Sequence, residues 1–228
     1  MKLAALVSGG KDSVFALYRA VKAGHEVRYI LNMLPEREDS WMFHHPNAAL
    51  VELQAKAMGI PLVRGTTRGE KEAELADLRR LIAKVAQEVE GIVTGALASN
   101  YQRERIERLC RELGLKTYSP LWGIEPESYW AELLANRFEV MITAVAAEGL
   151  GEEWLGVVVT REKLAELKRL AKQYRFHLGF EGGEAETLVL DMPLFRQRLV
   201  VKKARKLWRG NSGVYIIEEA ELAPKQGT

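Results

Sequence analysis

The sequence predicts an α/β protein: a doubly wound parallel sheet followed by a smaller C-terminal α+β domain. In the first half, short β-branched runs alternate with longer amphipathic stretches, which is typical of strands joined by crossover helices. After Trp122, several apolar strands follow one another with few helices between them, which indicates antiparallel pairing. Gly123 and Pro126 mark the boundary, so we place one domain at residues 1–121 and the other at residues 122–228.

The individual elements follow from hydrophobic periodicity and from turn residues. The first strand is LAALV, residues 3–7, and a helix runs from about Asp12 to Gly24. The later strands of this half are predicted at residues 26–34, 61–67, 92–98 and 116–122, and the helices at residues 49–59, 70–91 and 101–113. In the second half, helices are predicted at residues 127–138 and 161–176, and strands at residues 139–147, 186–193, 198–208 and 213–222.

Composition narrows the class of protein. The 228 residues carry a formal charge of +2, from 33 basic and 31 acidic side chains, which argues against a nucleic-acid partner. Cys110 is the only cysteine, which excludes an internal disulfide or a multi-thiolate metal site. Because the sequence has no apolar run of membrane-spanning length, we expect a cytoplasmic protein without a membrane partner. A homodimer is compatible with this composition.

The hexapeptide SGGKDS, residues 8–13, lies between the first predicted strand and the first predicted helix. Unpaired backbone N–H groups and the positive end of a helix meet there and favour an anion. A Walker loop does not fit, because Ala5 stands where its first glycine is needed and Asp12 where Ser or Thr should follow the lysine. An ordinary glycine-rich turn is the alternative, and the position directly after the first strand argues against it.

A second polar motif, GALASNYQRERIE at residues 95–107, follows the fourth predicted strand. This is the sheet edge at which doubly wound folds bind ligands. Arg103 and Arg105 cannot both lie on the apolar face of the following helix, so at least one is free to meet a phosphate or a carboxylate. The alternative is a solvated arginine face paired with Glu104 and Glu107.

A third motif, FEGGEAETLVLDMPLF at residues 180–195, gathers three carboxylates around two glycines. In an extended segment Glu184 and Glu186 point to the same side, which suits a bidentate cation site or an acid/base pair. An acidic hairpin turn before a buried strand is the alternative.

These three motifs, in this order, resemble the diphthine–ammonia ligase family. SGGKDS resembles the pyrophosphate loop of ATP pyrophosphatases, and GALAS-x-YQR-x-RIE and EGGE-x-ETLVLD resemble the family's second and third motifs. The resemblance implies an adenine nucleotide α-hydrolase-like (HUP) domain at residues 1–121 and an acceptor and catalytic domain at residues 122–228. It also implies ATP and Mg²⁺, adenylation of a carboxylate, attack by ammonia, and release of AMP and pyrophosphate. The implied acceptor is diphthine on elongation factor 2.

The resemblance also implies roles for individual residues. The loop that cradles the pyrophosphate of ATP comprises Ser8, Gly9, Gly10, Lys11 and Ser13, with Asp12 holding Mg²⁺. The residues placed around the nucleotide and the acceptor are Gly95, Ser99, Tyr101, Gln102, Arg103 and Arg105. The acceptor and ammonia site comprises Glu181, Gly182, Gly183, Glu184, Glu186, Thr187 and Asp191. The catalytic set is Lys11, Asp12, Glu181, Glu184 and Glu186.

Some positions resemble the family less closely. Phe180 stands where the family usually has a glycine, and Ala185 replaces a usual aromatic residue, so we expect a reshaped acceptor pocket. His44 is a candidate substrate contact, and His177 and Trp154 also have family counterparts.

Three alternative functions remain from the sequence: action on another carboxylate, modification of tRNA, and non-catalytic binding of ATP. Thiolation of tRNA generally uses paired cysteines, and a single cysteine argues against it. A binding module has no need of three carboxylates around two glycines.

Overall fold

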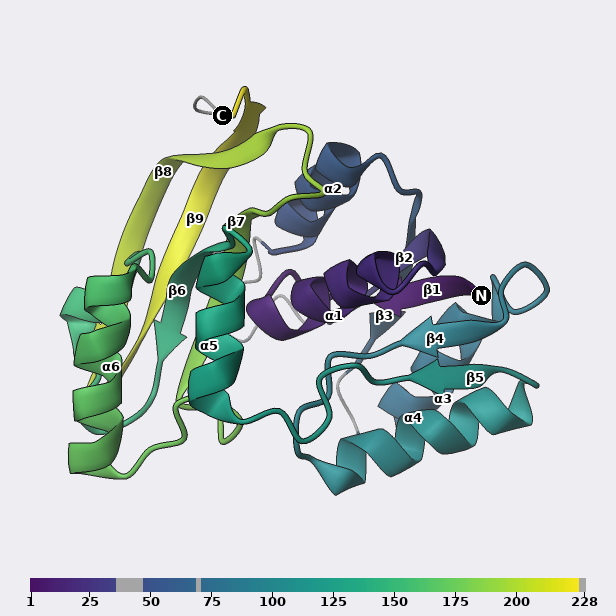
Figure 1. The fold of residues 1–228 in the computed structure, drawn as a ribbon, viewed down its shortest axis with the longest axis horizontal. Coiled ribbons are helices and arrows are strands. Elements are labelled where there is room, and N and C mark those ends of the chain that lie inside the picture. Colours follow the sequence, from purple (N-terminus) through teal and green to yellow (C-terminus); the bar gives the residue numbers. More distant parts are fainter. Residues whose placement is uncertain (36–46, 69–70, 226–228) are drawn as a thin grey trace. The chain divides into compact units, whose positions relative to one another are not determined.

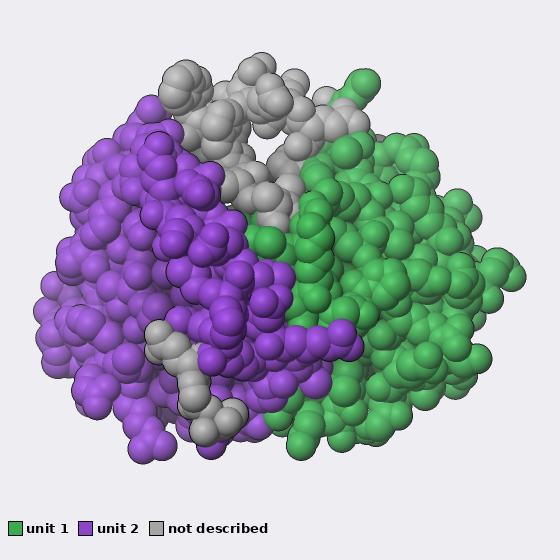
Figure 2. Space-filling view, turned by 90° about the horizontal axis from the view of Figure 1, so that it is seen from above, with its two compact units in different colours: residues 1–8, 12–123 green, residues 9–11, 124–228 purple. Residues whose placement is uncertain are grey.

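The computed structural model describes residues 1–35, 47–68 and 71–225. Contacts divide the chain into two compact units. The first comprises residues 1–8 and 12–123, and the second comprises residues 9–11 and 124–228 (Figure 2). The chain therefore enters the second unit for three residues near its start, and enters it again after residue 123.

The first unit contains a five-stranded parallel sheet (Figure 1). Its strands are β1 (Lys2–Leu6), β2 (Glu26–Pro35), β3 (Leu62–Thr67), β4 (Gly91–Val93) and β5 (Lys116–Tyr118). They are ordered β3-β2-β1-β4-β5. The strand order reverses between β1 and β4, and the loops that leave a doubly wound sheet at such a reversal form its usual ligand site.

The helices of this unit cover both faces of the sheet. They are α1 (Lys11–Lys22), α2 (Asn47–Met58), α3 (Lys71–Ala83) and α4 (Asn100–Glu112). Leu81 and Ile82 of α3 and Cys110 of α4 are buried in one core with Ala4 of β1. Leu3 and Ala5 point to the opposite face because side chains alternate along a strand, and Figure 1 shows α1 and α4 on opposite sides of the sheet. The predicted doubly wound sheet is confirmed.

Helix α3 is shorter than its sequence pattern predicts. The amphipathic stretch extends to residue 91, whereas the helix ends at Ala83. Backbone hydrogen bonds of the tighter turn type, from Lys84 to Leu81 and from Val85 to Ile82, replace the helical ones. Val85 is buried in the core beyond this turn. The same apolar residues therefore reach the core by a turn instead of further helix.

The second unit contains a four-stranded antiparallel sheet, as predicted, ordered β7-β6-β9-β8. Its elements are α5 (Pro126–Ala135), β6 (Glu139–Val145), the 3₁₀ turn η1 (Glu152–Trp154), α6 (Arg161–Tyr174), β7 (Ala185–Asp191), β8 (Arg198–Arg209) and β9 (Ser212–Ala223). Leu164 and Leu167 of α6 and Tyr129 and Trp130 of α5 are buried. Within the described ranges, no helix has the length and apolar character needed to cross a membrane.

Candidate functional site

The SGGKDS segment forms a tight loop between β1 and α1. Its two serines meet across the loop: the Ser8 N–H donates to the Ser13 Oγ at 3.1 Å, and the two hydroxyl oxygens lie 3.2 Å apart. Gly9 has φ of 93°, a left-handed conformation that a side chain disfavours. Helix α1 begins at Lys11, with Asp12 in its first turn. The loop therefore leaves the carboxyl end of the central strand and presents the start of a helix, as an anion site requires.

Gly95 follows β4 and lies against the first turn of α1. A Cβ added to Gly95 would come within 2.6 Å of the Asp12 carbonyl carbon and 2.7 Å of the Ser13 nitrogen. Both are backbone atoms that cannot turn aside. Only glycine allows the loop after β4 to approach the loop after β1 this closely, so Gly95 fits the backbone of α1 itself.

The second motif begins α4 and carries two arginines that stack on aromatic rings. Arg103 lies 4.5 Å from the centre of the Trp122 ring and donates from Nε to Glu107 at 2.6 Å. Arg105 lies 4.4 Å from the centre of the exposed Tyr101 ring. The alternative account, an arginine paired with a glutamate of its own helix, thus applies to the half-buried Arg103, and neither aromatic contact was foreseen.

The second motif also includes Ser99, whose carbonyl accepts the Arg103 N–H at 3.1 Å and so begins the helix. The Gln102 side chain and His44 lie outside the described part of the structure.

Asn32 is a buried polar residue at the carboxyl end of β2 that the sequence patterns did not single out. Its Nδ2 donates to the Val7 carbonyl at 2.8 Å, and its side chain is 4% exposed. The Asn32 Oδ1 has no hydrogen-bond partner among the described residues. An unsatisfied buried acceptor is rare, so this atom is a candidate ligand contact at the same sheet edge. The signal was a lone amide inside the apolar run YILNML.

Lys11, the lysine of the loop, is buried in the second unit. Its side chain is 1% exposed, and its ammonium donates to the Gly179 carbonyl at 2.7 Å. The ammonium also lies over three aromatic rings, at 5.2 Å from the centre of Tyr129, 5.8 Å from Trp130 and 5.5 Å from Phe180. We call these three rings and the Gly179 carbonyl the lysine cage.

The backbone of residues 9–11 is bonded to β7. The Lys11 N–H donates to the Thr187 Oγ1 at 3.0 Å, and the Gly9 carbonyl accepts the Val189 N–H at 3.0 Å. The sequence places both β7 residues in or beside the third motif. The structure therefore joins the first and third motifs directly within the second unit.

The acidic turn of the third motif is organised by the Glu184 carboxylate. Its two oxygens accept the His177 N–H at 3.0 Å and the Gly182 N–H at 2.7 Å. The His177 Nδ1 in turn accepts the Gly179 N–H at 3.1 Å. Gly183 in this turn has φ of 81°, the conformation that favours glycine.

The other two glutamates are placed differently. Glu186 is exposed, and because residues alternate along β7 it lies on the opposite face from Thr187. Glu181 is half-buried and directly follows Phe180 of the lysine cage. Glu184 and Glu186 thus differ in their contacts, because the Glu184 carboxylate is engaged with the backbone of the turn and Glu186 is exposed. Their pairing on one side of the strand stays a prediction.

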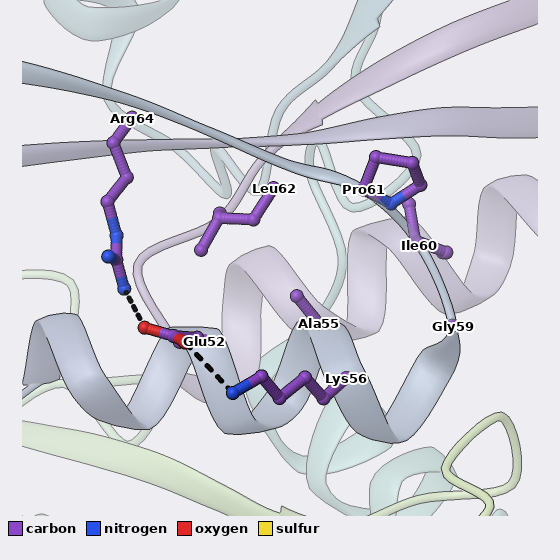
Figure 3. Close-up of a pocket in the computed structure, with 8 residues that line it drawn as sticks. All are labelled: Glu52, Ala55, Lys56, Gly59, Ile60, Pro61, Leu62 and Arg64. Carbon is purple, nitrogen blue, oxygen red and sulfur yellow. Dashed lines mark hydrogen bonds and ion pairs between the residues drawn. The ribbon is translucent and has the colours of Figure 1, made fainter.

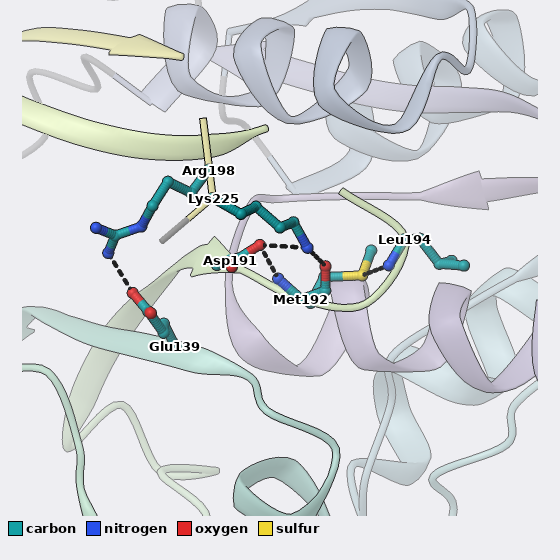
Figure 4. Close-up of polar contacts among 6 residues, drawn as sticks. All are labelled: Glu139, Asp191, Met192, Leu194, Arg198 and Lys225. Atoms are coloured by element: carbon teal, nitrogen blue, oxygen red, sulfur yellow. Dashed lines mark hydrogen bonds and ion pairs between the residues drawn. The ribbon is translucent and has the colours of Figure 1, made fainter. Parts of the chain in front are cut away.

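Asp191 ends β7 and is engaged by the C-terminal segment (Figure 4). Its Oδ1 accepts the Met192 N–H at 2.8 Å and lies 2.9 Å from the Lys225 ammonium. That ammonium also donates to the Met192 carbonyl at 2.9 Å. Nearby, Arg198 of β8 pairs with Glu139 of β6. These contacts are those of a structural tie between strands.

A surface hollow of about 570 Å³ lies elsewhere in the first unit (Figure 3). It is lined by the C-terminal part of α2 and the start of β3, and therefore lies at the amino ends of the strands. Glu52 in this hollow pairs with Lys56 and Arg64, each at 2.9 Å, and these hydrogen bonds lower the pKa of the Glu52 carboxyl. The hollow lies at the edge of the sheet opposite to the loops described above, which leave the carboxyl ends of the strands.

A glycine-rich anion loop between β1 and α1, at the strand reversal of a parallel sheet, defines an α/β protein of the nucleotide-binding class. Comparison with known proteins then identifies the family. Residues 1–117 match the diphthamide synthase N-terminal domain, and residues 125–223 match the diphthamide synthase C-terminal domain. The chain belongs to the diphthine–ammonia ligase family, and it is an enzyme of the ATP-dependent ligase type. The resemblance predicted from the three motifs is confirmed.

Relatives support this membership along most of the chain. The diphthine–ammonia ligases of Rattus norvegicus and Homo sapiens are each 36% identical over 222 residues, covering 88% of this chain and 83% of the relative. That of Schizosaccharomyces pombe is 37% identical over 219 residues, covering 36% of a longer protein. A solved structure described as a predicted subunit of tRNA methyltransferase from Methanocaldococcus jannaschii matches with a TM-score of 0.45 and 18% identity, covering 84% of this chain and 97% of that one.

Proposed function

We propose that this enzyme uses ATP to adenylate the carboxylate of diphthine on elongation factor 2 and then forms the amide with ammonia. In the first step an acceptor carboxylate oxygen attacks the α-phosphorus, and pyrophosphate leaves. In the second step ammonia attacks the acyl carbon, a proton leaves the nitrogen, and AMP carries away the bridging oxygen. The names of the relatives support the acceptor and the nitrogen donor.

The observation that carries the proposal is the position of the SGGKDS loop. It follows the central strand β1 at the point where the strand order reverses, and Gly95 from the neighbouring β4 packs on it. Backbone N–H groups at a helix start bind phosphate oxygens, and Ser8 and Ser13 add hydroxyl donors. In this proposal the loop holds the departing pyrophosphate and leaves the α-phosphorus open to the acceptor.

Asp12 is the residue proposed to hold Mg²⁺. Among the described residues, no three His, Cys, Asp or Glu side chains gather as a metal site. That fits Mg²⁺, which is commonly bound through one or two carboxylates together with substrate phosphates and water. The ion would supply charge to stabilise the leaving pyrophosphate. Asp12 lies in the first turn of α1, directly after the loop.

Glu181 is the residue we propose as the proton acceptor in the amide-forming step. Glu184 is engaged with two backbone N–H groups, and Glu186 is exposed on the other face of β7 from Thr187. Glu181 directly follows the lysine cage and is half-buried. A carboxylate at this position suits removal of a proton from the ammonium adduct. Replacing Glu181 with Gln should lower the rate of amide formation more than the rate of adenylation.

The decisive experiment follows an isotope. Elongation factor 2 carrying diphthine with ¹⁸O in its carboxylate is incubated with the enzyme, ATP, Mg²⁺ and ammonium, and the nucleotide products are analysed by mass spectrometry. Adenylation transfers one ¹⁸O atom to AMP. The matched control is elongation factor 2 with the unmodified histidine, which should give no AMP above background.

Two results would contradict the proposal. Formation of ADP and phosphate would exclude attack at the α-phosphorus. Formation of AMP without ¹⁸O, or to the same extent with the unmodified factor, would show that the diphthine carboxylate is not what attacks.

A further inference from the structure

The lysine cage gives the loop lysine an arrangement that is unusual for a phosphate ligand. A phosphate-binding lysine reaches into the ligand space as a mobile point charge. Lys11 instead has its side chain enclosed, with its ammonium 2.7 Å from the Gly179 carbonyl. The rings of Tyr129, Trp130 and Phe180 surround the same ammonium, and Tyr129 and Trp130 are themselves buried.

Three members of the cage, Trp130, Phe180 and Gly179, are fixed by contacts of their own. The Trp130 Nε1 donates to the Leu178 carbonyl at 2.9 Å, and its ring meets the Phe180 ring edge to face at 5.9 Å. The Gly179 N–H is held by the His177 ring, which the Glu184 carboxylate anchors through the His177 backbone. Three rings and a carbonyl so constrained can hold an ammonium in one place.

Phe180 is the cage member whose backbone is strained. Its φ of 63° lies in the left-handed region, which is disfavoured for a bulky side chain by about 1–2 kcal/mol. The backbone here suits glycine, so the strain persists only because the ring is held by its surroundings. The contacts that hold it are Trp130, Phe176 and the Lys11 ammonium.

Lys11 is also held through its backbone. With its ammonium in the cage, Lys11 donates from its backbone N–H to Thr187 at 3.0 Å, and two residues earlier Gly9 accepts from Val189 at 3.0 Å. The side chain and the main chain of residues 9–11 are therefore both held by the second unit.

We propose that Lys11 is a positioning residue: caged by Tyr129, Trp130, Phe180 and Gly179, its ammonium holds Gly9 and Gly10 in the conformation that binds pyrophosphate. This positioning role rests on the proposed function, because it explains how the pyrophosphate loop keeps its binding conformation. The acidic turn sets the cage through His177 and Gly179, so the third motif supports the phosphate loop as well as the acceptor chemistry. The ammonium stays in the cage when the loop is filled.

Nuclear magnetic resonance of ¹³C-labelled lysine tests this directly. Protons near the faces of three rings are shifted upfield, and the Lys11 signal is identified by its loss in Lys11→Met. We expect an upfield-shifted Lys11 signal in the free enzyme that keeps its shift when Mg²⁺ and pyrophosphate are added to saturation. Return of the signal to the position of an ordinary lysine on addition of pyrophosphate would overturn the proposal, because the ammonium would have moved to the ligand.

A double-mutant cycle on pyrophosphate affinity gives a second readout. Lys11→Met and Phe180→Leu should each weaken binding about tenfold or more, and the double variant should be little worse than either, because both break one unit. Phe180→Gly also removes the ring but relieves the backbone strain, so it keeps the cycle informative if Phe180→Leu folds poorly. Lys163→Met is the matched control, since Lys163 is a lysine of the same unit that lies over an aromatic ring, that of Trp154, and belongs to helix α6. Additive losses from Lys11 and Phe180 would overturn the proposal.

The outcomes also separate this inference from the proposed function. If pyrophosphate binds and Lys11 leaves the cage, the inference fails and the proposed function stands. If the wild-type enzyme with a caged Lys11 binds neither ATP nor pyrophosphate, the proposed function fails, and the positioning role falls with it.

Discussion

The carboxylate of Glu184 accepts the backbone N–H of Gly182 at 2.7 Å and closes the acidic turn of the third motif. Its other oxygen accepts the His177 N–H. A carboxylate with both oxygens bonded to the main chain acts first on the shape of the turn. The motif that looks most catalytic in the sequence thus contains a residue whose contacts are architectural.

Replacing Glu184 with Gln should destabilise the protein. An amide has one acceptor oxygen in place of two, so one of the two backbone N–H groups loses its partner, at a cost of about 1 kcal/mol in the free energy of unfolding. Urea denaturation measures this, with Glu186→Gln as the control, because Glu186 is exposed and should change stability little. A Glu184→Gln protein of unchanged stability and no activity would instead show Glu184 to be the catalytic base.

Replacing Gly95 with Ala should weaken ATP binding by at least about tenfold, because the new Cβ collides with the backbone of Asp12 and Ser13 and displaces the start of α1. Titration calorimetry measures the affinity. Gly65→Ala is the matched control: its Cβ would meet the Leu81 Cβ at 3.2 Å and the flexible Met33 Sδ at 3.3 Å, a milder crowding than the backbone contacts under 3 Å at Gly95. Undiminished ATP affinity in Gly95→Ala would mean that the loop does not bind ATP in this conformation.

Asp191→Asn and Lys225→Met should have similar effects. Each breaks the 2.9 Å ion pair between the end of β7 and the C-terminal segment, so each should lower the free energy of unfolding by about 1 kcal/mol, with non-additive effects in the double variant. Turnover should change equally in the two. If only Asp191→Asn loses turnover, Asp191 acts on the acceptor as the family motif suggests.

The cap of α5 should make stability depend on pH. Hydrogen bonds from the Ser128 and Glu127 N–H groups lower the pKa of the Glu125 carboxyl below its ordinary value. A lowered pKa in the folded state contributes stability that is fully present above the unfolded pKa, about 4.3, and is lost as the pH falls through the folded pKa. Thermal melting measured from pH 7 to pH 3 should therefore give the wild type a higher melting temperature than Glu125→Gln at neutral pH. This difference in melting temperature should shrink as the pH falls. A difference in melting temperature that stays constant with pH would show that the Glu125 carboxylate is not its cause.

Much of the fold could be predicted from the sequence because strand and helix periods are local properties. The sequence alone shows the apolar face of α4 and the glycine that follows the end of α1. The end of α3 could not be predicted, because the periodic pattern continues to residue 91. Only the packing of Val85 in the core shows that the helix is replaced by a turn.

The candidate site was predicted less completely. The motifs identified the loop and the acidic turn, since both follow or precede apolar strands. The partners of Lys11 could not be predicted, because Gly179 lies 168 residues further along the chain and no local period connects them. The bonds of the Glu184 carboxylate to the His177 and Gly182 N–H groups likewise depend on how the turn folds, and the strand pattern does not show them.

The passage of residues 9–11 into the second unit limits how this enzyme can be taken apart. A fragment cut at the apparent linker near residue 123 would retain every letter of SGGKDS yet lack the rings, the carbonyl and the threonine that shape it. Recombination with a foreign C-terminal half would require that half to supply counterparts of these groups. Engineering of either half therefore has to take account of the other, although each half has its own sheet.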